Sequence, residues 1–365
     1  MLNRDALAEL YRELRPEKVL SVYLNGKTND FSERNVWRRR LEVEISEARK
    51  RVNGAAPDES ALFDKALERV KDQLDEFDQF LPDRGWVGFA TQDRLVHAEA
   101  VRVPMPDLVR WEEGIRVAPY VRALKQDRPV VTALVDSQRA RIFEYRGGGL
   151  AEVHDLNADT FLGDLSDINV SKRPTSRSGV RGKTGSDAAK RSLAVSSERM
   201  MKHLAEILTE QAGADGLVVV GGSAEAIAAL QGQLPSQLGS RTIERPSMNL
   251  EMKDAEIRKG VEAAASQINQ DIQGRLLEEV VDLARSGGRG ALGARDVEEA
   301  LGRGSVDTLL LSRGFIKANT DYADHLVGAA FEQHADVEEL SFEGGARLDS
   351  EGEGVAARLR FTVES

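Results

Sequence analysis

The sequence predicts an α/β protein with three domains, each a mixed sheet flanked by helices. Apolar, strand-like runs occur at residues 18–24, 130–136 and 305–315, and amphipathic helical patterns accompany each run. Charged, proline-containing breaks at 125–129 and 245–246 separate them. A length of 365 residues is typical of two or three domains, at roughly 100–200 residues for each domain.

The first domain is predicted to span residues 1–126. The run KVLSVYL at 18–24 reads as a buried strand, and apolar residues at helical spacing predict helices over about 32–52 and 59–81. Two alternating segments around Gln92 then predict a β-hairpin, which gives this domain its α/β character.

The second domain is predicted to span residues 127–246. The continuous apolar strand at 130–136 is followed by an alternating strand and then by a long basic loop at 171–186, directly before a long helix. Another buried strand follows at 215–222, and Ser223 is placed to cap the next helix. This order predicts a compact α/β unit.

The third domain is predicted to span residues 247–365. It begins with a long helical region that has a weak point near Gly274, and the run SVDTLLLSRGF at 305–315 predicts a strand. GGARLDSEGEG at 344–354 reads as an acidic glycine loop, and the last strand is expected over 355–363.

Composition excludes several classes of protein. A hydrophobic content of 41 % with 30 % charged residues is that of an ordinary globular protein, and no run approaches the ~18 apolar residues of a membrane helix. The absence of cysteine excludes disulfides, thiolate metal sites and cysteine nucleophiles, and favours a cytoplasmic location. Five scattered histidines show no metal-ligand spacing, so neither a metal nor a cofactor is expected.

Residues 171–191, called the basic segment below, carry seven positive charges and one negative charge in a chain of net charge −11. Because a helical pattern follows, the segment is expected to approach phosphate groups from the N-terminal end of a helix. The alternative is a solvated loop with no partner. The positive residues are Lys172, Arg173, Arg177, Arg181, Lys183, Lys190 and Arg191.

Local motifs for catalysis are weak. Gly182-Lys183-Thr184 suggests a nucleotide-binding P-loop, but Arg177 stands where that motif needs glycine. The acidic run 349–353 lacks the calcium-loop pattern, and Gly221-Gly222 lacks the spacing of a dinucleotide-binding turn. Asp136 reads as a strand-end cap, because no histidine or serine motif accompanies it. No catalytic residue is therefore predicted.

Three pieces together resemble a known family. The strand and hairpin from Val130, the basic loop with the helix after it, and the pair SVDTLLLS and GVAARLRF occur in one order. This order is similar to the archaeo-eukaryotic class-1 release factor and Pelota superfamily, in its divergent bacterial branch. The resemblance covers essentially the whole chain and implies the same three-domain architecture.

The chain departs from this family at two motifs. Release factors carry Gly-Gly-Gln at the loop tip, which falls here at about Gly182-Lys183-Thr184 and lacks the second glycine and the glutamine. That motif supplies flexibility and a positioned donor at the reacting centre, so ester hydrolysis is not expected. Codon-specific termination is not expected either, because the codon-reading motifs of the first domain are absent.

The resemblance therefore implies a ribosome-binding translation factor. It would occupy the A site and peptidyl-transferase region of idle or stalled ribosomes, in hibernation or rescue. A translational GTPase similar to elongation factor Tu is the implied partner of the third domain, and no membrane partner is expected. The residues expected to contact ribosomal RNA are Lys172, Arg173, Arg177, Arg181, Gly182, Lys183, Thr184, Lys190 and Arg191.

Two alternatives stay open. The first is a peptidyl-tRNA hydrolase in which Thr184 or a backbone amide replaces the glutamine. The second is an interaction protein that does not bind ribosomes and uses the basic segment only as a charged surface. Activity that is abolished by changes at 182–184 would favour the first alternative. Weak, salt-insensitive RNA affinity would favour the second, because contacts to phosphate lose affinity steeply as salt rises.

Overall fold

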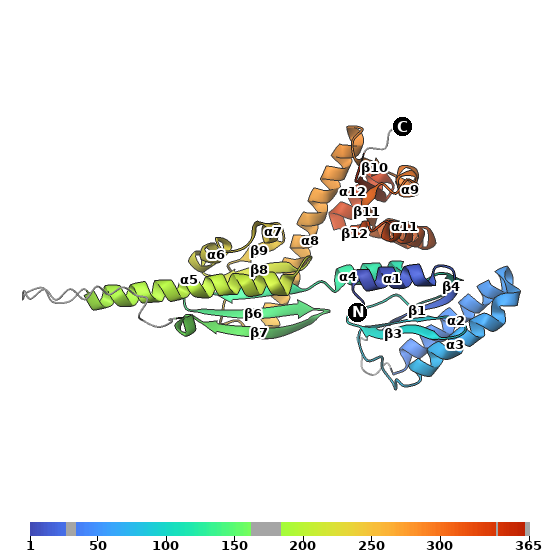
Figure 1. Ribbon diagram of the computed structural model, residues 1–365, viewed down its shortest axis with the longest axis horizontal. Coiled ribbons are helices and arrows are strands. Elements are labelled where there is room, and N and C mark those ends of the chain that lie inside the picture. Colours follow the sequence, from blue (N-terminus) through green and yellow to red (C-terminus); the bar gives the residue numbers. More distant parts are fainter. Residues whose placement is uncertain (27–33, 162–183, 341, 362–365) are drawn as a thin grey trace, which may run out of the picture. The chain divides into compact units, whose positions relative to one another are not determined.

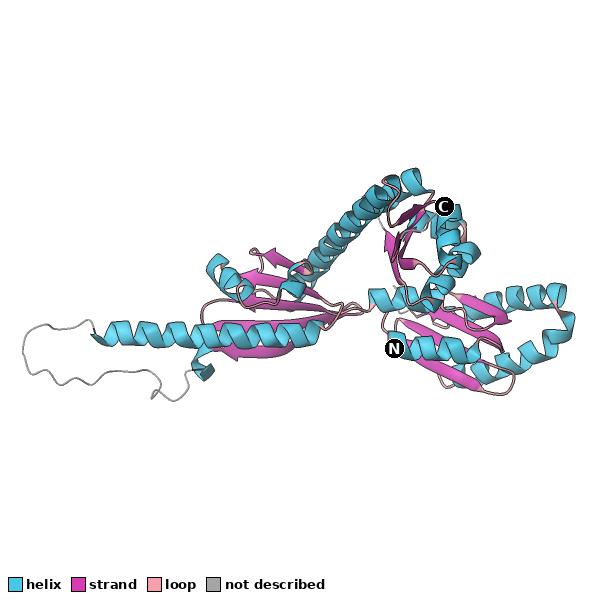
Figure 2. Ribbon diagram, turned by 45° about the horizontal axis from the view of Figure 1, so that its top comes forward, coloured by secondary structure: helices cyan, strands magenta, loops and turns pink. Residues whose placement is uncertain are grey.

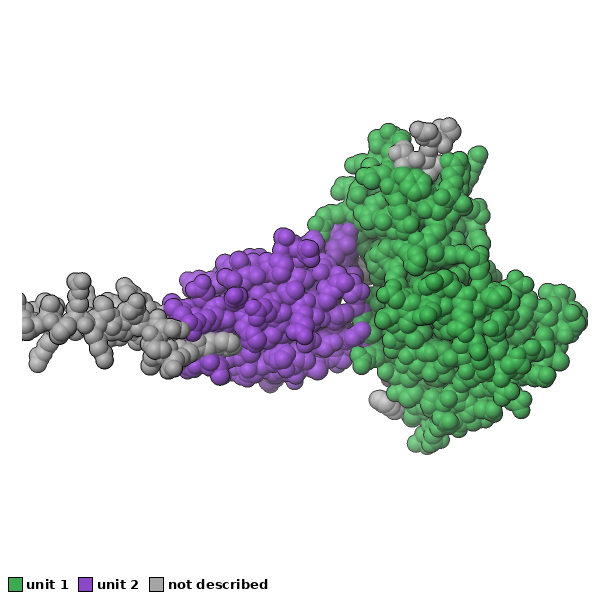
Figure 3. Space-filling model, viewed as in Figure 1, with its two compact units in different colours: residues 1–127, 273–365 green, residues 128–272 purple. Residues whose placement is uncertain are grey.

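The computed structural model describes residues 1–26, 34–161, 184–340 and 342–361. The chain forms two compact units (Figure 3): unit 1 combines Met1–Asp127 with Gln273–Ser365, and unit 2 is Arg128–Ile272. Three separate sheets with helices against them confirm the predicted α/β fold class (Figures 1 and 2).

The N-terminal sheet of unit 1 has the order β3-β2-β1-β4 and is antiparallel throughout, whereas the sequence predicts a mixed sheet for each domain. Its strands are β1 (Lys18–Asn25), β2 (Gly85–Ala90), β3 (Leu95–Val101) and β4 (Leu108–Glu113). The β2–β3 pair is the hairpin expected around Gln92. Helices α2 (Val36–Ala55) and α3 (Ser60–Leu74) cover one face, and α1 (Arg4–Leu14) and α4 (Ala118–Gln126) cover the other.

The central strand β1 explains why both faces need a cover. Its even-numbered Leu20, Val22 and Leu24 pack under α2 and α3, whereas Val19 and Tyr23 pack against the cluster of α1 and α4. Side chains alternate between the two faces of a strand, so a strand with apolar side chains on both faces must be buried on both sides.

The C-terminal sheet of unit 1 has the order β10-β13-β11-β12, with β11 parallel to β12 and antiparallel to β13. Its strands are β10 (Gly290–Leu292), β11 (Val306–Ser312), β12 (Asp336–Leu340) and β13 (Val355–Leu359). Helices α9 (Ala294–Gly302) and α11 (Thr320–Glu332) belong to the apolar cluster on one face, and α10 (Arg313–Ala318) follows β11 directly.

The prediction of an acidic glycine loop over 344–354 is wrong, because Phe342–Gly352 forms helix α12. Leu348 is fully buried against β11 and β13, and the Asp349 carboxylate accepts a hydrogen bond from the Ser312 hydroxyl. This burial overrides the weak helix propensity of Gly344 and Gly345. The turn that the glycine pattern signalled lies at Glu353 and Gly354, both with positive φ.

Unit 2 contains a five-stranded sheet of order β7-β6-β5-β8-β9. Strand β5 pairs antiparallel with β6 and parallel with β8, so the sheet is mixed. Its strands are β5 (Val130–Val135), β6 (Arg139–Arg146), β7 (Gly149–Asn157), β8 (Leu217–Gly222) and β9 (Thr242–Arg245). One face packs against α5 (Thr184–Ala212), α6 (Ala224–Gln231) and α7 (Ser236–Gly239).

Helix α8 (Asp254–Arg285) is continuous through the weak point expected near Gly274. Its first part, with Ile257, Val261 and Ile268, packs on the second face of the unit 2 sheet. The expected domain boundary at 246–247 lies ahead of this helix, whereas the compact unit extends to Ile272. The apolar stripe of α8 is read from sequence easily, but its target sheet is not.

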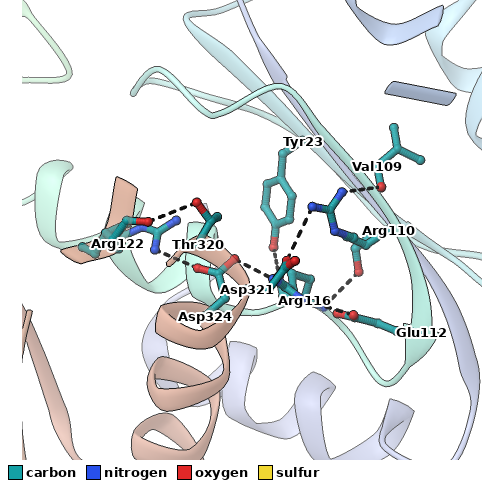
Figure 4. A network of polar contacts seen from close by, with 11 residues as sticks. Tyr23, Val109, Arg110, Glu112, Arg116, Arg122, Thr320, Asp321 and Asp324 are labelled. Atoms are coloured by element: carbon teal, nitrogen blue, oxygen red, sulfur yellow. Dashed lines mark hydrogen bonds and ion pairs between the residues drawn. The ribbon is translucent and has the colours of Figure 1, made fainter. Parts of the chain in front are cut away.

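A buried carboxylate joins the N-terminal and C-terminal parts of unit 1 (Figure 4). The side chain of Asp324, on α11, is 1 % exposed and lies 3.0 Å from Arg116 Nε and 2.9 Å from Arg122 Nη1. Arg116 also pairs with Glu112 and Asp321. Burial alone would lower the pKa of Arg116, but Glu112 and Asp324 outweigh it, so this pKa is raised.

We expect Asp324→Asn to lower the free energy of unfolding of unit 1 by about 3–5 kcal/mol, because two buried guanidinium groups lose their shared counter-charge. The neighbouring Asp321→Asn is the matched control, since the Asp321 side chain is 75 % exposed, and should cost at most about 1 kcal/mol. Urea unfolding followed by tryptophan fluorescence measures both, because Trp37, Trp86 and Trp111 all lie in unit 1. Equal effects of the two substitutions would contradict the prediction.

A second polar cluster bridges the same two parts of unit 1. Lys125 Nζ lies 2.6 Å from Asp336 and 2.8 Å from Glu338, and Arg4 also pairs with Asp336. Burial raises the pKa of Asp336, but Lys125 and Arg4 outweigh burial and hold the pKa below its usual value.

Because the folded-state pKa of Asp336 is below the unfolded value, its contribution to stability is present above about pH 4 and lost as the pH falls further. We therefore expect Asp336→Asn to destabilise unit 1 at pH 6 and to have a smaller effect at pH 3. Unfolding free energies of both proteins across this pH range test the prediction. A difference that does not change with pH would refute it.

Candidate functional site

The sequence-predicted RNA-contacting residues fall at the start of α5 and just before it. Lys172, Arg173, Arg177, Arg181, Gly182 and Lys183 lie outside the described residues. Thr184, Lys190 and Arg191 belong to α5, whose backbone is described there without their side chains. The structure therefore describes the support of the basic segment, and the RNA-contacting role of these residues stays a prediction.

The C-terminal half of α5 is fixed to the unit 2 sheet (Figure 1). Its buried side chains pack with Val131, Ala133 and Val135 of β5 and with Val218 and Val220 of β8. The anchoring residues of the helix are Met200, Met201, Leu204, Ala205, Ile207, Leu208 and Ala212. They recur at three- and four-residue spacing, which is why the sequence pattern predicted this helix.

The N-terminal half of α5 is packed much less. Leu193 and Val195 are 40 % and 42 % exposed, and Ser196 is buried. At about 1.5 Å for each residue, the helix extends roughly 24 Å from Met200 to its first residue, Thr184. Residues 184–191 of the basic segment therefore form the end of α5 that lies away from Met200.

The segment that precedes residue 162 also packs on α5. Strand β7 ends at Asn157, and a short 3₁₀ helix, η2 (Ala158–Phe161), follows and packs on α5. Ala158 is buried in the α5 cluster, and its backbone N–H donates to Gln138 O at 2.7 Å. Both flanks of residues 162–183 thus start from one supported structure.

Arginines of the adjacent hairpin are already paired within the sheet. Arg139 makes two hydrogen bonds to the Asp155 carboxylate, at 3.0 and 2.7 Å, and Arg141 makes two to Glu152, at 2.9 and 2.7 Å. The bonds from Arg141 and Arg139 hold the pKa values of Glu152 and Asp155 below their usual values. Such fork-like pairs leave little capacity for an added phosphate.

The strand ends of this sheet contain turns and caps. Asp136 Oδ1 accepts hydrogen bonds at 2.7 Å from the N–H groups of Gln138 and Arg139, as expected for a strand-end cap. Ser223 Oγ accepts from Ala226 N and caps α6, as predicted. Gly222 has φ +129°, and a Cβ there would lie 1.8 Å from Val135 O, so glycine is required by the close approach of β5 and β8.

The described residues contain neither a metal-ligand cluster nor a membrane-spanning helix. No group of three or more His, Asp or Glu side chains there could hold a metal ion. None of the described helices is long and apolar enough to cross a membrane.

The family model "Bacterial archaeo-eukaryotic release factor family 10" matches residues 116–270, which include all of the unit 2 sheet and α5. This part of the chain is similar to the bacterial archaeo-eukaryotic release factors. The family resemblance inferred from the sequence is confirmed. The family match ends at residue 270, within α8. The residues of α8 that pack on the unit 2 sheet, from Ile257 to Ile268, therefore lie inside the match.

Solved structures similar to the chain include an archaeal translation termination factor, aRF1, with 18 % identity, 99 % of each chain covered and a TM-score of 0.27. A ribosome-bound archaeal Pelota has 15 % identity, with 99 % and 95 % covered and a TM-score of 0.45. S. cerevisiae Dom34, a translation termination-like factor, has 10 % identity, with 79 % and 74 % covered and a TM-score of 0.45. A comparison with curated proteins finds no match. The family model carries the assignment, because every TM-score here is below 0.5.

Sequence reasoning missed the charged contacts of unit 1. Asp324 lies 208 residues after Arg116 and 202 residues after Arg122, and the docking of α11 brings them together. One signal was available: Asp324 shares the apolar stripe of its helix with Val327 and Phe331, at helical spacing. A carboxylate at a core position of a helix indicates a buried partner cation.

We expect Leu204→Ala to destabilise unit 2 by about 2–5 kcal/mol, because this fully buried side chain fixes α5 to the sheet. Leu193→Ala on the exposed part of the same helix should change stability by no more than about 0.5 kcal/mol. Native-state hydrogen exchange of β5 and β8 measures both. Faster exchange in the Leu193 variant than in the Leu204 variant would contradict the prediction that Leu204 fixes α5 to the sheet.

Proposed function

We propose that the protein is a ribosome-binding translation factor that inserts the basic segment into the peptidyl-transferase region of idle or stalled ribosomes. It acts there in hibernation or rescue, without codon-specific termination. The observation that carries the proposal is the position of the basic segment, which precedes and enters α5 within a release-factor domain. This places the action in the cytoplasm, where such ribosomes occur.

Charge supports a contact with RNA. The basic segment has seven positive charges against one negative charge, whereas Arg139 and Arg141 of the neighbouring hairpin are occupied by carboxylates. Ribosomal RNA presents phosphates, to which arginine binds through a planar fork and lysine through a point charge. The acidic remainder of the chain disfavours binding to RNA elsewhere on its surface.

The sequence at the loop tip supports occupancy of the site over hydrolysis. Gly-Gly-Gln occurs nowhere in the chain, and Gly182-Lys183-Thr184 stands at the expected tip. Thr184 is shorter than glutamine and would direct its hydroxyl differently. The factor therefore occupies the site at which a release factor acts and does not cleave the peptidyl-tRNA ester.

A translational GTPase is the proposed partner of the C-terminal domain. The Dom34 comparison structure is described as interacting with Hbs1, a statement that concerns that protein. For this chain, the proposal is that a GTPase similar to elongation factor Tu delivers the factor. It rests on the family resemblance and not on an identified contact residue.

Co-sedimentation with ribosomes tests the main proposal. We expect the wild-type chain to bind and the variant Arg177→Ala, Arg181→Ala, Lys183→Ala to lose about tenfold or more in affinity, with a weaker dependence on salt. The matched control is Arg49→Ala, Lys50→Ala, Lys71→Ala, which removes the same charge from exposed ion pairs of α2 and α3.

Peptidyl-tRNA hydrolysis is measured on the same samples. Binding without hydrolysis, lost only in the basic-segment variant, is the expected result. Hydrolysis that depends on residues 182–184 would instead establish the enzyme alternative. Equal binding by both variants would refute a specific role of the basic segment.

A further inference from the structure

A pocket of about 370 Å³ lies in unit 1 and is lined mainly by its N-terminal part. Helix α2 contributes Arg51, strand β4 contributes Arg110 and Trp111, and the following loop contributes Arg116. The pocket is within the size range of small-molecule sites, which begins at about 300 Å³.

Two guanidinium groups meet in this pocket. Arg51 Nη2 and Arg110 Nη1 both donate to the carbonyl oxygen of Val109, at 3.2 and 3.1 Å. Because both nitrogens bond the same oxygen, their separation cannot exceed the sum of the two N···O distances. The two positively charged groups are therefore close neighbours. Figure 4 shows the bond from Arg110 to Val109.

Among the described residues, neither arginine forms an ion pair with a carboxylate of the N-terminal part of unit 1, although Glu44 acts on Arg110 and Glu47 interacts with Arg51 at longer range. Among the residues that the structure describes, no carboxylate lies within 4.0 Å of an Arg51 nitrogen. Arg110 is half-buried, and burial together with the neighbouring Arg51 charge lowers its pKa. Like charges held together in a partly dry pocket favour an added anion.

Three carboxylates line the pocket, and among the described residues only Asp321, from the C-terminal part of unit 1, pairs with Arg110; Glu59 pairs with Lys18 and Glu112 with Arg116. Asp321, at the start of α11, lies 3.5 Å from Arg110 Nη2 and 2.6 Å from Arg116 Nη2 (Figure 4). Burial raises its pKa, but Arg116 and Arg110 outweigh this and keep the pKa low, so Asp321 is ionised. Its side chain is 75 % exposed and can be displaced without opening the core.

We propose that Arg51 and Arg110 form a phosphate-binding site and that Asp321 is an internal competitor at its mouth. A phosphate group has enough oxygen atoms to accept hydrogen bonds from both guanidinium groups at once. The Asp321 carboxylate pairs with Arg110 and, among the contacts described, not with Arg51. Arg116 stays bound to Asp324 throughout, because that carboxylate is buried.

The competition links ligand binding to the contact between two parts of unit 1. A phosphate that displaces Asp321 removes one exposed ion pair of α11 but leaves the buried Arg116–Asp324–Arg122 contact in place. Binding should therefore weaken that contact modestly without separating the two parts. The phosphate can belong to a free nucleotide or to an RNA strand, and the site chemistry is the same for both.

The test is ¹⁹F NMR of the full chain labelled with 5-fluorotryptophan. Trp111 lines the pocket, whereas Trp37 and Trp86 do not, so its resonance reports this site and not the basic segment. The Trp111 resonance is assigned with Trp111→Phe. We expect inorganic pyrophosphate to shift the Trp111 signal alone, and to do so less as salt rises.

Three variants decide the assignment. Arg51→Ala, at an exposed position, should weaken the pyrophosphate affinity by about tenfold or more through the loss of a charged hydrogen bond. Asp321→Asn should strengthen it by about two- to fivefold, because an exposed competitor is removed. Arg49→Ala, which removes the same charge from the same helix but from a pair with Asp64, should leave the affinity unchanged.

Several results would overturn the proposal: no shift in either the wild type or Asp321→Asn, equal effects of the Arg51 and Arg49 variants, or weaker binding by Asp321→Asn. Parallel titrations with ATP and with a short oligouridylate lacking terminal phosphates distinguish the sources of phosphate. A shift by ATP alone assigns a nucleotide site, and a shift by the RNA alone assigns a site for RNA backbone. Neither result depends on whether the factor binds ribosomes.

Discussion

The buried carboxylate of Asp324, held between Arg116 and Arg122, is the contact on which the organisation of unit 1 depends. It joins segments about 200 residues apart in the chain, since the separations are 208 and 202. A charge at 1 % side-chain exposure requires its partners, so the N-terminal and C-terminal sheets cannot separate without leaving charges unpaired in an apolar interface. Lys125 with Asp336 extends the same principle at a less buried position.

Unit 2 uses a different principle. Its core is apolar, and among the side chains that the structure describes, those from Met200 onward fix α5 to the sheet. The packed half supplies rigidity, and the exposed half supplies distance from the sheet. A segment rich in positive charge cannot pack in a core, so a long anchored helix is a direct way to present it. The charge of the basic segment and the anchoring of α5 both support the proposal that this segment contacts RNA.

The basic segment and the Arg51–Arg110 pair differ in the acidic residues that accompany them. The basic segment contains one acidic residue, Asp187, whereas Arg110, next to Arg51, pairs with Asp321 from a distant part of the chain. The first is suited to an extended polyanion and the second to a single phosphate group. Local positive charge therefore coexists with a net charge of −11, as both phosphate-binding proposals require.

The sequence alone determined the α/β class, the order of most strands and helices, the caps at Asp136 and Ser223, and the release-factor resemblance. These depend on local periodicity, turn chemistry and motif order, which are written in consecutive residues. Only the tertiary structure decided that Phe342–Gly352 is helical, that α8 packs on the middle sheet, and that Arg51 and Arg110 meet at Val109. Each of these depends on a surface supplied by a distant part of the chain, and a local pattern specifies only what a residue needs, not which partner supplies it.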